Sequence, residues 1–162
     1  MKVRSLPLFL LRLFLLALIS ASAPTILAEN PPSCHIAVTS PVAGASVGRA
    51  AMVEGTATVP AGERFLWAFA RIKGEVEAWP QGGGPLLIDD RGGWAVHVYF
   101  GERDDIGSDF EVILQVVEKR DNTLLDAWVQ NAKQQRPPSS IKLPPSVEGC
   151  SVARLTVKKV SH

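Results

Sequence analysis

Short runs in which apolar and polar residues alternate recur along most of the chain, and this pattern constrains the fold more than any other feature. In the two clearest runs, 94–100 and 110–116, every second residue is apolar, as in a strand with one buried face. The chain has 13 glycines, and they lie mostly between such runs, where turns are needed. Regularly spaced short strands predict an antiparallel β-sandwich. The other candidate strands are 35–39, 52–59, 65–72, 75–79 and 153–158.

The candidate strand at 65–72 differs from the others, because it is apolar at nearly every position. A strand of this kind is covered on both faces, so we expect it at the centre of a sheet with a layer on each side. In the run at 110–116, by contrast, Glu111 and Gln115 alternate with apolar residues. We therefore expect these two side chains to face solvent.

One segment repeats its apolar residues at helical spacing instead. We predict a single amphipathic helix from Thr123 to Gln134, with either Asp121 or Asn122 capping its start and Pro137-Pro138 following its end. We expect the helix to pack its apolar face on the sandwich. That face consists of Leu124, Leu125, Trp128, Val129 and Ala132.

Residues 1–28 have the composition of a secretory signal peptide. Three basic residues and no acidic one precede an apolar run at 13–19, and small residues continue up to Ala28. This order predicts cleavage after Ala28, export to the periplasm or the cell exterior, and a single mature domain at 29–162. An uncleaved membrane anchor is the disfavoured alternative, because the apolar run is too short to span a bilayer.

The only two cysteines, Cys34 and Cys150, lie near the two ends of this mature region. In an exported chain such a pair predicts one structural disulfide, which would close a loop of nearly the whole domain. If the first and last strands pair in parallel, the two cysteines begin them at the same end of the sheet, within bonding reach. A reactive thiol or a metal-binding pair is the alternative, although neither cysteine belongs to a Cys-x-x-Cys motif.

The balance of charges bears on the partners of the protein. The formal net charge of the chain is +1, and loss of the basic signal peptide makes the rest slightly acidic. With no strong positive field, the protein is not expected to bind nucleic acid. Apolar residues make up 46% of the chain, which excludes a disordered protein. Contact with a membrane is expected only through the signal peptide before cleavage.

Several short motifs resemble bacterial extracellular immunoglobulin-like domains. The resemblance begins with Thr39-Ser40-Pro41, Gly44, Val47 and the run Val53-Glu54-Gly55-Thr56-Ala57. It continues through Leu66-Trp67, Trp79-Pro80-Gln81, Gly93-Trp94 and Gly107, and so covers roughly residues 36–117. The resemblance implies an immunoglobulin-like antiparallel β-sandwich outside the cytoplasm. Because members of this family are mostly binding or spacer modules, it implies no particular reaction.

Candidate catalytic and metal-binding groups are scattered. His35 and His97 lie on predicted strands, and no serine lies in a Gly-x-Ser-x-Gly sequence. The acidic loop 102–109 could offer oxygen ligands to calcium, but its spacing does not match a helix-loop-helix calcium site. A weaker likeness to periplasmic copper carriers rests on His35 and the turn that follows it. We assign no catalytic residue, metal or cofactor, and we keep a small periplasmic metal-binding protein or enzyme as the alternative function.

The four tryptophans fall into two groups. Trp79 lies at the end of a predicted strand, beside Pro80, Gln81 and the glycines at 82–84. An aromatic side chain in this place can stack on a sugar ring or anchor a protein partner. The other three lie on predicted apolar faces and are expected in the core, namely Trp67, Trp94 and Trp128.

Because the loops of a sandwich cluster at its two ends, we expect segment 79–84 and loop 102–109 to form one binding surface. The candidate contacts on this surface are Trp79, Gln81, Asp104 and Asp105. The sequence thus predicts an exported, non-catalytic binding module of the bacterial cell envelope, with a protein partner favoured and a carbohydrate second. A periplasmic inhibitor or immunity protein against a toxin enzyme is a further alternative.

Overall fold

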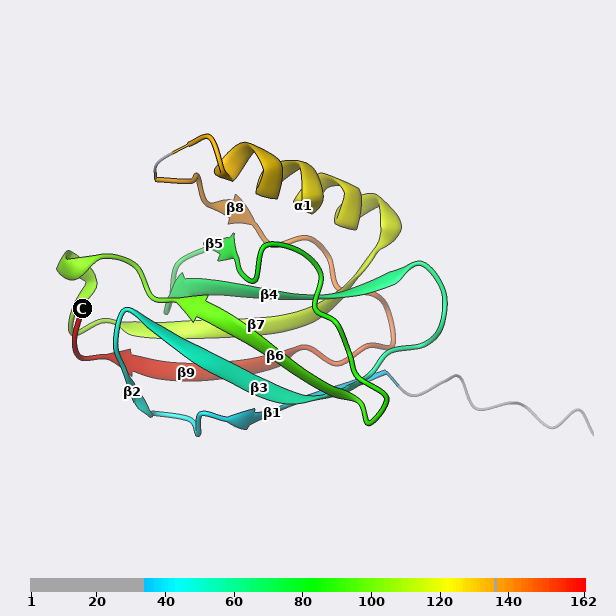
Figure 1. Ribbon diagram of the computed structural model, residues 1–162, viewed down its shortest axis with the longest axis horizontal. Coiled ribbons are helices and arrows are strands. Elements are labelled where there is room, and N and C mark those ends of the chain that lie inside the picture. Colours follow the sequence, from blue (N-terminus) through cyan, green and yellow to red (C-terminus); the bar gives the residue numbers. More distant parts are fainter. Residues whose placement is uncertain (1–33, 136) are drawn as a thin grey trace, which may run out of the picture.

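The computed structural model describes residues 34–135 and 137–162, which form two β-sheets and one α-helix (Figure 1). The predicted signal peptide, residues 1–28, lies outside this described part and stays a prediction. Within the described part, no helix is both long enough and apolar enough to cross a membrane.

The two sheets differ in width. The smaller sheet has three antiparallel strands in the order β1-β3-β6, and the larger has six in the order β2-β9-β7-β4-β5-β8. In the larger sheet β2 and β9 pair in parallel, and the other neighbours are antiparallel. The predicted mainly-β sandwich with one added helix is confirmed. The strands are β1 (His35–Ser40), β2 (Ser46–Val47), β3 (Ala50–Thr58), β4 (Arg64–Ile72), β5 (Glu77–Pro80), β6 (Gly93–Tyr99), β7 (Asp109–Glu118), β8 (Ile141–Lys142) and β9 (Ala153–Lys159).

The larger sheet takes part in two hydrophobic cores, one on each face. Between the sheets, Leu66, Ala68 and Ala70 of β4 pack in the main core, which also contains residues of the smaller sheet. On the other face, Trp67 and Phe69 pack in a second core with residues of α1 (Lys119–Ala132). Figure 1 shows the helix lying across this outer face. The prediction that residues 65–72 form a central strand with both faces covered is confirmed.

The predicted bounds of the helix, Thr123 to Gln134, are wrong by four residues at its start and by two at its end. The helix begins at Lys119, directly after β7, with Glu118 at the N-cap, and it ends at Ala132. Neither Asp121 nor Asn122 caps it, because both lie inside the first turns. The Asn122 side chain is buried and accepts a hydrogen bond of 2.8 Å from Trp67 Nε1. A residue type that favours caps is thus used here to satisfy a buried indole.

Two predictions about exposure are also corrected. Gln115 is buried, and its amide donates to the backbone oxygen of Pro144, because the chain after the helix covers this face of β7. Glu111 is half-buried and pairs with Arg71 and Arg154. On the helix, Leu124 is 61% exposed, so the apolar face is narrower than the spacing suggests. Leu125 and Val129 are the buried residues of that face.

Cys34 and Cys150 form the predicted disulfide, and their Cα atoms lie 4.6 Å apart. They are also partners in an isolated parallel bridge, which precedes β1 and β9. Beyond this bridge the first strand does not continue along the last one, because β1 pairs with β3 in the other sheet. The parallel pairing resumes only where Ser46–Val47 joins β9.

Candidate functional site

A pocket of about 420 Å³ opens at one side of the sandwich, and its shape follows from the unequal widths of the sheets. The smaller sheet ends at β6, whereas β5 extends the larger sheet past β4. Ala70 and Trp79 are directly paired, so their side chains lie on the same, inner face. Ala70 is buried in the main core, but Trp79 lies beyond the cover of the smaller sheet and is only half-buried. The uncovered inner face becomes one wall of the pocket.

Most of the pocket lining is apolar. Ile72 and Phe110 extend the main core into it, and the indole rings of Trp79 and Trp128 line it from β5 and α1. Both indole N–H groups are already used, because Trp79 Nε1 donates to Pro138 O at 3.1 Å and Trp128 Nε1 donates to Ser139 O at 2.9 Å. These bonds fix the rings against the segment after the helix. The rings therefore offer the pocket apolar surface rather than hydrogen-bond donors.

The buried side chain of Gln81 connects two walls of the pocket. Its side chain is 7% exposed, its Oε1 accepts the backbone N–H of Tyr99 at 2.9 Å, and its Nε2 donates to Trp79 O at 3.0 Å. One amide thus links the end of β5 in the larger sheet to the end of β6 in the smaller sheet. With both ends of the amide engaged, its main role in the structure is to hold the two walls together.

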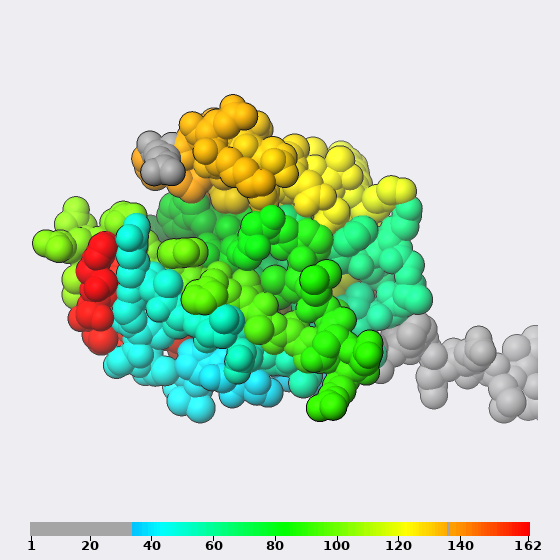
Figure 2. All heavy atoms as spheres, in the orientation of Figure 1, coloured from blue at the N-terminus to red at the C-terminus, as the bar shows by residue number. Residues whose placement is uncertain are grey.

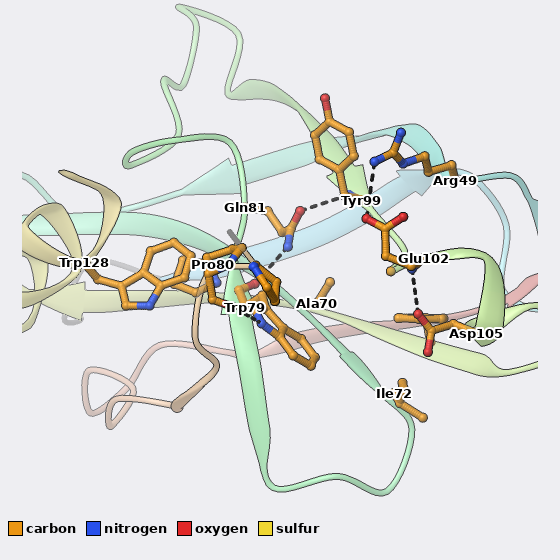
Figure 3. A pocket seen from close by; sticks show the side chains of 14 residues that line it. Arg49, Ala70, Ile72, Trp79, Pro80, Gln81, Tyr99, Glu102, Asp105 and Trp128 are labelled. Carbon is orange, nitrogen blue, oxygen red and sulfur yellow. Dashed lines mark hydrogen bonds and ion pairs between the residues drawn. The ribbon is translucent and has the colours of Figure 1, made fainter. Parts of the chain in front are cut away.

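Charged groups gather at the other side of the pocket, as Figure 3 shows. Glu102 pairs with Arg49 at 3.3 Å and with His162 at 3.4 Å. The hydrogen bond with His162 and the charge of Arg49 hold the pKa of the Glu102 carboxyl below its usual value, so this side chain is ionised at neutral pH. Asp105 closes the loop by accepting the backbone N–H of Glu102 through Oδ2, at 2.6 Å.

The loop that carries Glu102 and Asp105 is held by its own capping interactions and by a buried lysine. Its single helical turn, η1 (Arg103–Asp105), is closed by a capping box between Glu102 and Asp105. The side chain of Lys159 is fully buried and donates to the backbone oxygen of Glu102. In Figure 2 the C-terminal residues (red) lie against this yellow-green loop. Strand β9, which ends at Lys159, therefore holds the charged side of the pocket in place.

Of the four contacts predicted from the sequence, the structure brings Trp79, Gln81 and Asp105 to one pocket. Asp104 does not line it and is exposed. Trp128, which we expected in the core, is half-buried and lines the pocket while it packs against the second core.

Sequence reasoning did not single out Arg49 or Tyr99, which also line the pocket. The alternation in run 94–100 did place the Tyr99 side chain opposite the apolar face, but nothing in it indicated a site. No local signal marks Arg49, because its position depends on the contact of the segment before β3 with the η1 loop.

The residues proposed for the alternative functions do not come together. His35 and His97 are exposed and lie on different strands, β1 and β6. Within residues 34–135 and 137–162, no three His, Cys, Asp or Glu side chains are grouped as metal ligands. Among the described residues that line the pocket, none is Ser, Thr, Cys or His. The pocket thus presents apolar surface together with an arginine, a tyrosine and two carboxylates.

No family model matches the sequence, and no curated protein matches it. We therefore infer a function from the geometry of the pocket.

Proposed function

We propose that the protein is an exported, non-catalytic binding module of the bacterial cell envelope, and that its pocket holds part of a protein partner. The observation that carries this proposal is the half-open pocket between the indole of Trp79 and the acidic η1 loop. Protein interfaces draw most of their binding energy from such places, where an anchor side chain enters an apolar pocket with a polar rim.

The polar groups beside the aromatic rings are already hydrogen-bonded within the protein, which favours a protein ligand over a carbohydrate. A sugar needs several convergent donors and acceptors as well as an aromatic face. Here the N–H groups of Trp79 and Trp128 and both ends of the Gln81 amide are bonded within the protein. What remains is apolar surface on one side and charged groups on the other, which suits a side chain from a protein.

Export is supported by the disulfide, because such bonds persist in oxidising compartments. It is also supported by the signal-peptide composition of residues 1–28. The resemblance to extracellular immunoglobulin-like domains agrees with a binding role at such a location. A role as a periplasmic inhibitor or immunity protein is one form of the same proposal, in which the partner is a toxin enzyme.

Affinity capture tests the proposal. The full chain is produced with its own leader, and the oxidised protein is recovered, immobilised and exposed to envelope proteins of the producing cells. We expect a specific protein to be retained, and its recovery to fall at least about tenfold with Trp79→Ala, as for a central anchor contact. Asp104→Asn is the control, because Asp104 lies in the neighbouring loop but outside the pocket.

Trp79→Phe keeps an aromatic ring and should retain the partner in part, and circular dichroism checks that each variant is folded. Equal recovery with wild type and a folded Trp79→Ala would refute the pocket as the binding site. Retention of a glycan alone would redirect the proposal to carbohydrate.

A further inference from the structure

The pocket has two chemically different sides. Its aromatic side consists of Trp79 and Trp128, and its charged side consists of Arg49, Glu102 and Asp105 (Figure 3). A ligand that fills the space between them must be apolar along its length and polar at one end. Long basic side chains have this construction, because an apolar stem carries a charged head.

The side chains that line the charged side carry two negative charges and one positive charge, and the buried ammonium of Lys159 lies beneath the same loop. Arg49 is the only basic side chain among the described lining residues, and it pairs with Glu102. Asp105 is partly buried, and its Oδ2 accepts the backbone N–H of Glu102. Among residues 34–135 and 137–162, Asp105 forms no ion pair, and its Oδ1 has no hydrogen-bond partner. The Oδ1 atom of Asp105 reaches solvent, so a positive group that enters the pocket can form a charge-assisted hydrogen bond with it.

We propose that this pocket receives a basic side chain of the protein partner, with arginine preferred to lysine. The inference rests on the proposed function and names the residue type that the pocket selects. The stem packs along Trp79 and Ile72, and the head reaches Asp105. Arginine fits better because its planar guanidinium presents several donors to a carboxylate in a fixed geometry, whereas the ammonium of lysine is a compact point charge. The structure already contains one contact between a guanidinium and a carboxylate here, from Arg49 to Glu102.

Short peptides test the inference without knowledge of the partner. The probes are acetyl-Gly-Arg-Gly-amide, the same peptide with citrulline, which has nearly the same shape without charge, and the same peptide with norleucine. Each is titrated into the full-length oxidised protein while NMR follows the indole N–H signals of Trp79 and Trp128. We expect saturable shifts of the Trp79 signal with the arginine peptide, and an affinity at least about fivefold weaker with citrulline.

Two neighbouring acids provide matched variants. Asp105→Asn keeps an acceptor for the N–H of Glu102 but removes the charge from the pocket. It should weaken binding of the arginine peptide at least about fivefold and leave the citrulline peptide unchanged. Asp104→Asn removes the same charge outside the pocket and should change either affinity less than about twofold.

The outcomes separate this inference from the proposed function. Equal affinity for arginine and norleucine, or no shift with any of the three peptides, overturns the preference for a basic side chain. That preference is also overturned if Asp104→Asn weakens binding as much as Asp105→Asn does. None of these results affects capture of a protein partner through Trp79, which stands or falls with the Trp79→Ala experiment.

Discussion

Asn122 shows how one side chain can connect the helix to the sheet. Its Oδ1 accepts the Trp67 indole N–H at 2.8 Å, and its amide nitrogen donates to Asp126 at 3.0 Å. Trp67 is fully buried. Without Asn122 the indole donor would stay buried and unbonded.

Asn122→Ala should therefore lower the free energy of unfolding by about 1 to 3 kcal/mol, the usual cost of a buried unpaired donor. Urea denaturation followed by tryptophan fluorescence measures this difference. Asn131→Ala is the matched control on the same helix, because Asn131 is exposed and its loss should cost less than about 0.5 kcal/mol. Similar losses in both variants would show that the bond to Trp67 contributes little.

Residue roles at the pocket could be read from the sequence only in part. Trp79 stood out because an aromatic residue at a strand end, beside proline and glycines, has no obvious place in a core. Gln81 looked like a ligand contact for the same reason, yet it is buried and bonded to Tyr99 and Trp79. The sequence could not show this, because the acceptor that Tyr99 needs comes from another sheet.

Among the elements, β4 was the most predictable, because its unbroken apolar sequence requires cover on both faces. The start of α1 was not predictable from capping residues, since β7 passes directly into the helix at Glu118 and Lys119. The burial of Gln115 was hidden for a related reason. Its partner is Pro144 in the chain after the helix, and local alternation contains no information about that return path.

Gly55 fixes the packing of β3 between its neighbours. A Cβ atom there would overlap the carbonyl oxygen of Ala37 and the indole ring of Trp94. Since the overlap involves backbone and a buried ring, neither neighbour can easily move.

Gly55→Ala should cost about 3 kcal/mol or more, at the upper end of the usual effect of overpacking. Gly84→Ala is the control, because a Cβ at Gly84 meets nothing within 4 Å. Its urea midpoint should stay close to that of the wild type. A tolerated Gly55→Ala would mean that the Trp94 ring repacks, and a crystal structure of the variant would show the shift.

At the scale of the whole molecule, the difference in sheet width produces the pocket, because β5 extends beyond the cover of β6. Strand order of this kind depends on tertiary pairing, so the sequence predicted a clustered loop surface but not a cavity. The disulfide was predictable, because the sequence has only two cysteines and each therefore has one possible partner.

The Cys34–Cys150 bond joins residues that are 116 positions apart in the sequence. In the chain-entropy model, removal of a cross-link over so long a loop should lower the free energy of unfolding by about 4 to 5 kcal/mol. The double variant Cys34→Ala/Cys150→Ala and reduced wild type should show the same fall in urea stability. Reductant should not affect the double variant further. A loss below about 2 kcal/mol would show that the reduced unfolded chain already keeps its ends close.

Site-specific photo-crosslinking tests the pocket as a partner site most directly. Benzoylphenylalanine replaces Tyr99, which lines the pocket and is 59% exposed, in the full chain inside the producing cells. The control position is Val42, which is 74% exposed and does not line the pocket. Position 99 should give one crosslinked protein, absent when Trp79→Ala is added, and position 42 should give none. A crosslink from position 42 alone, or one from position 99 that persists in a folded Trp79→Ala variant, would contradict the proposed site.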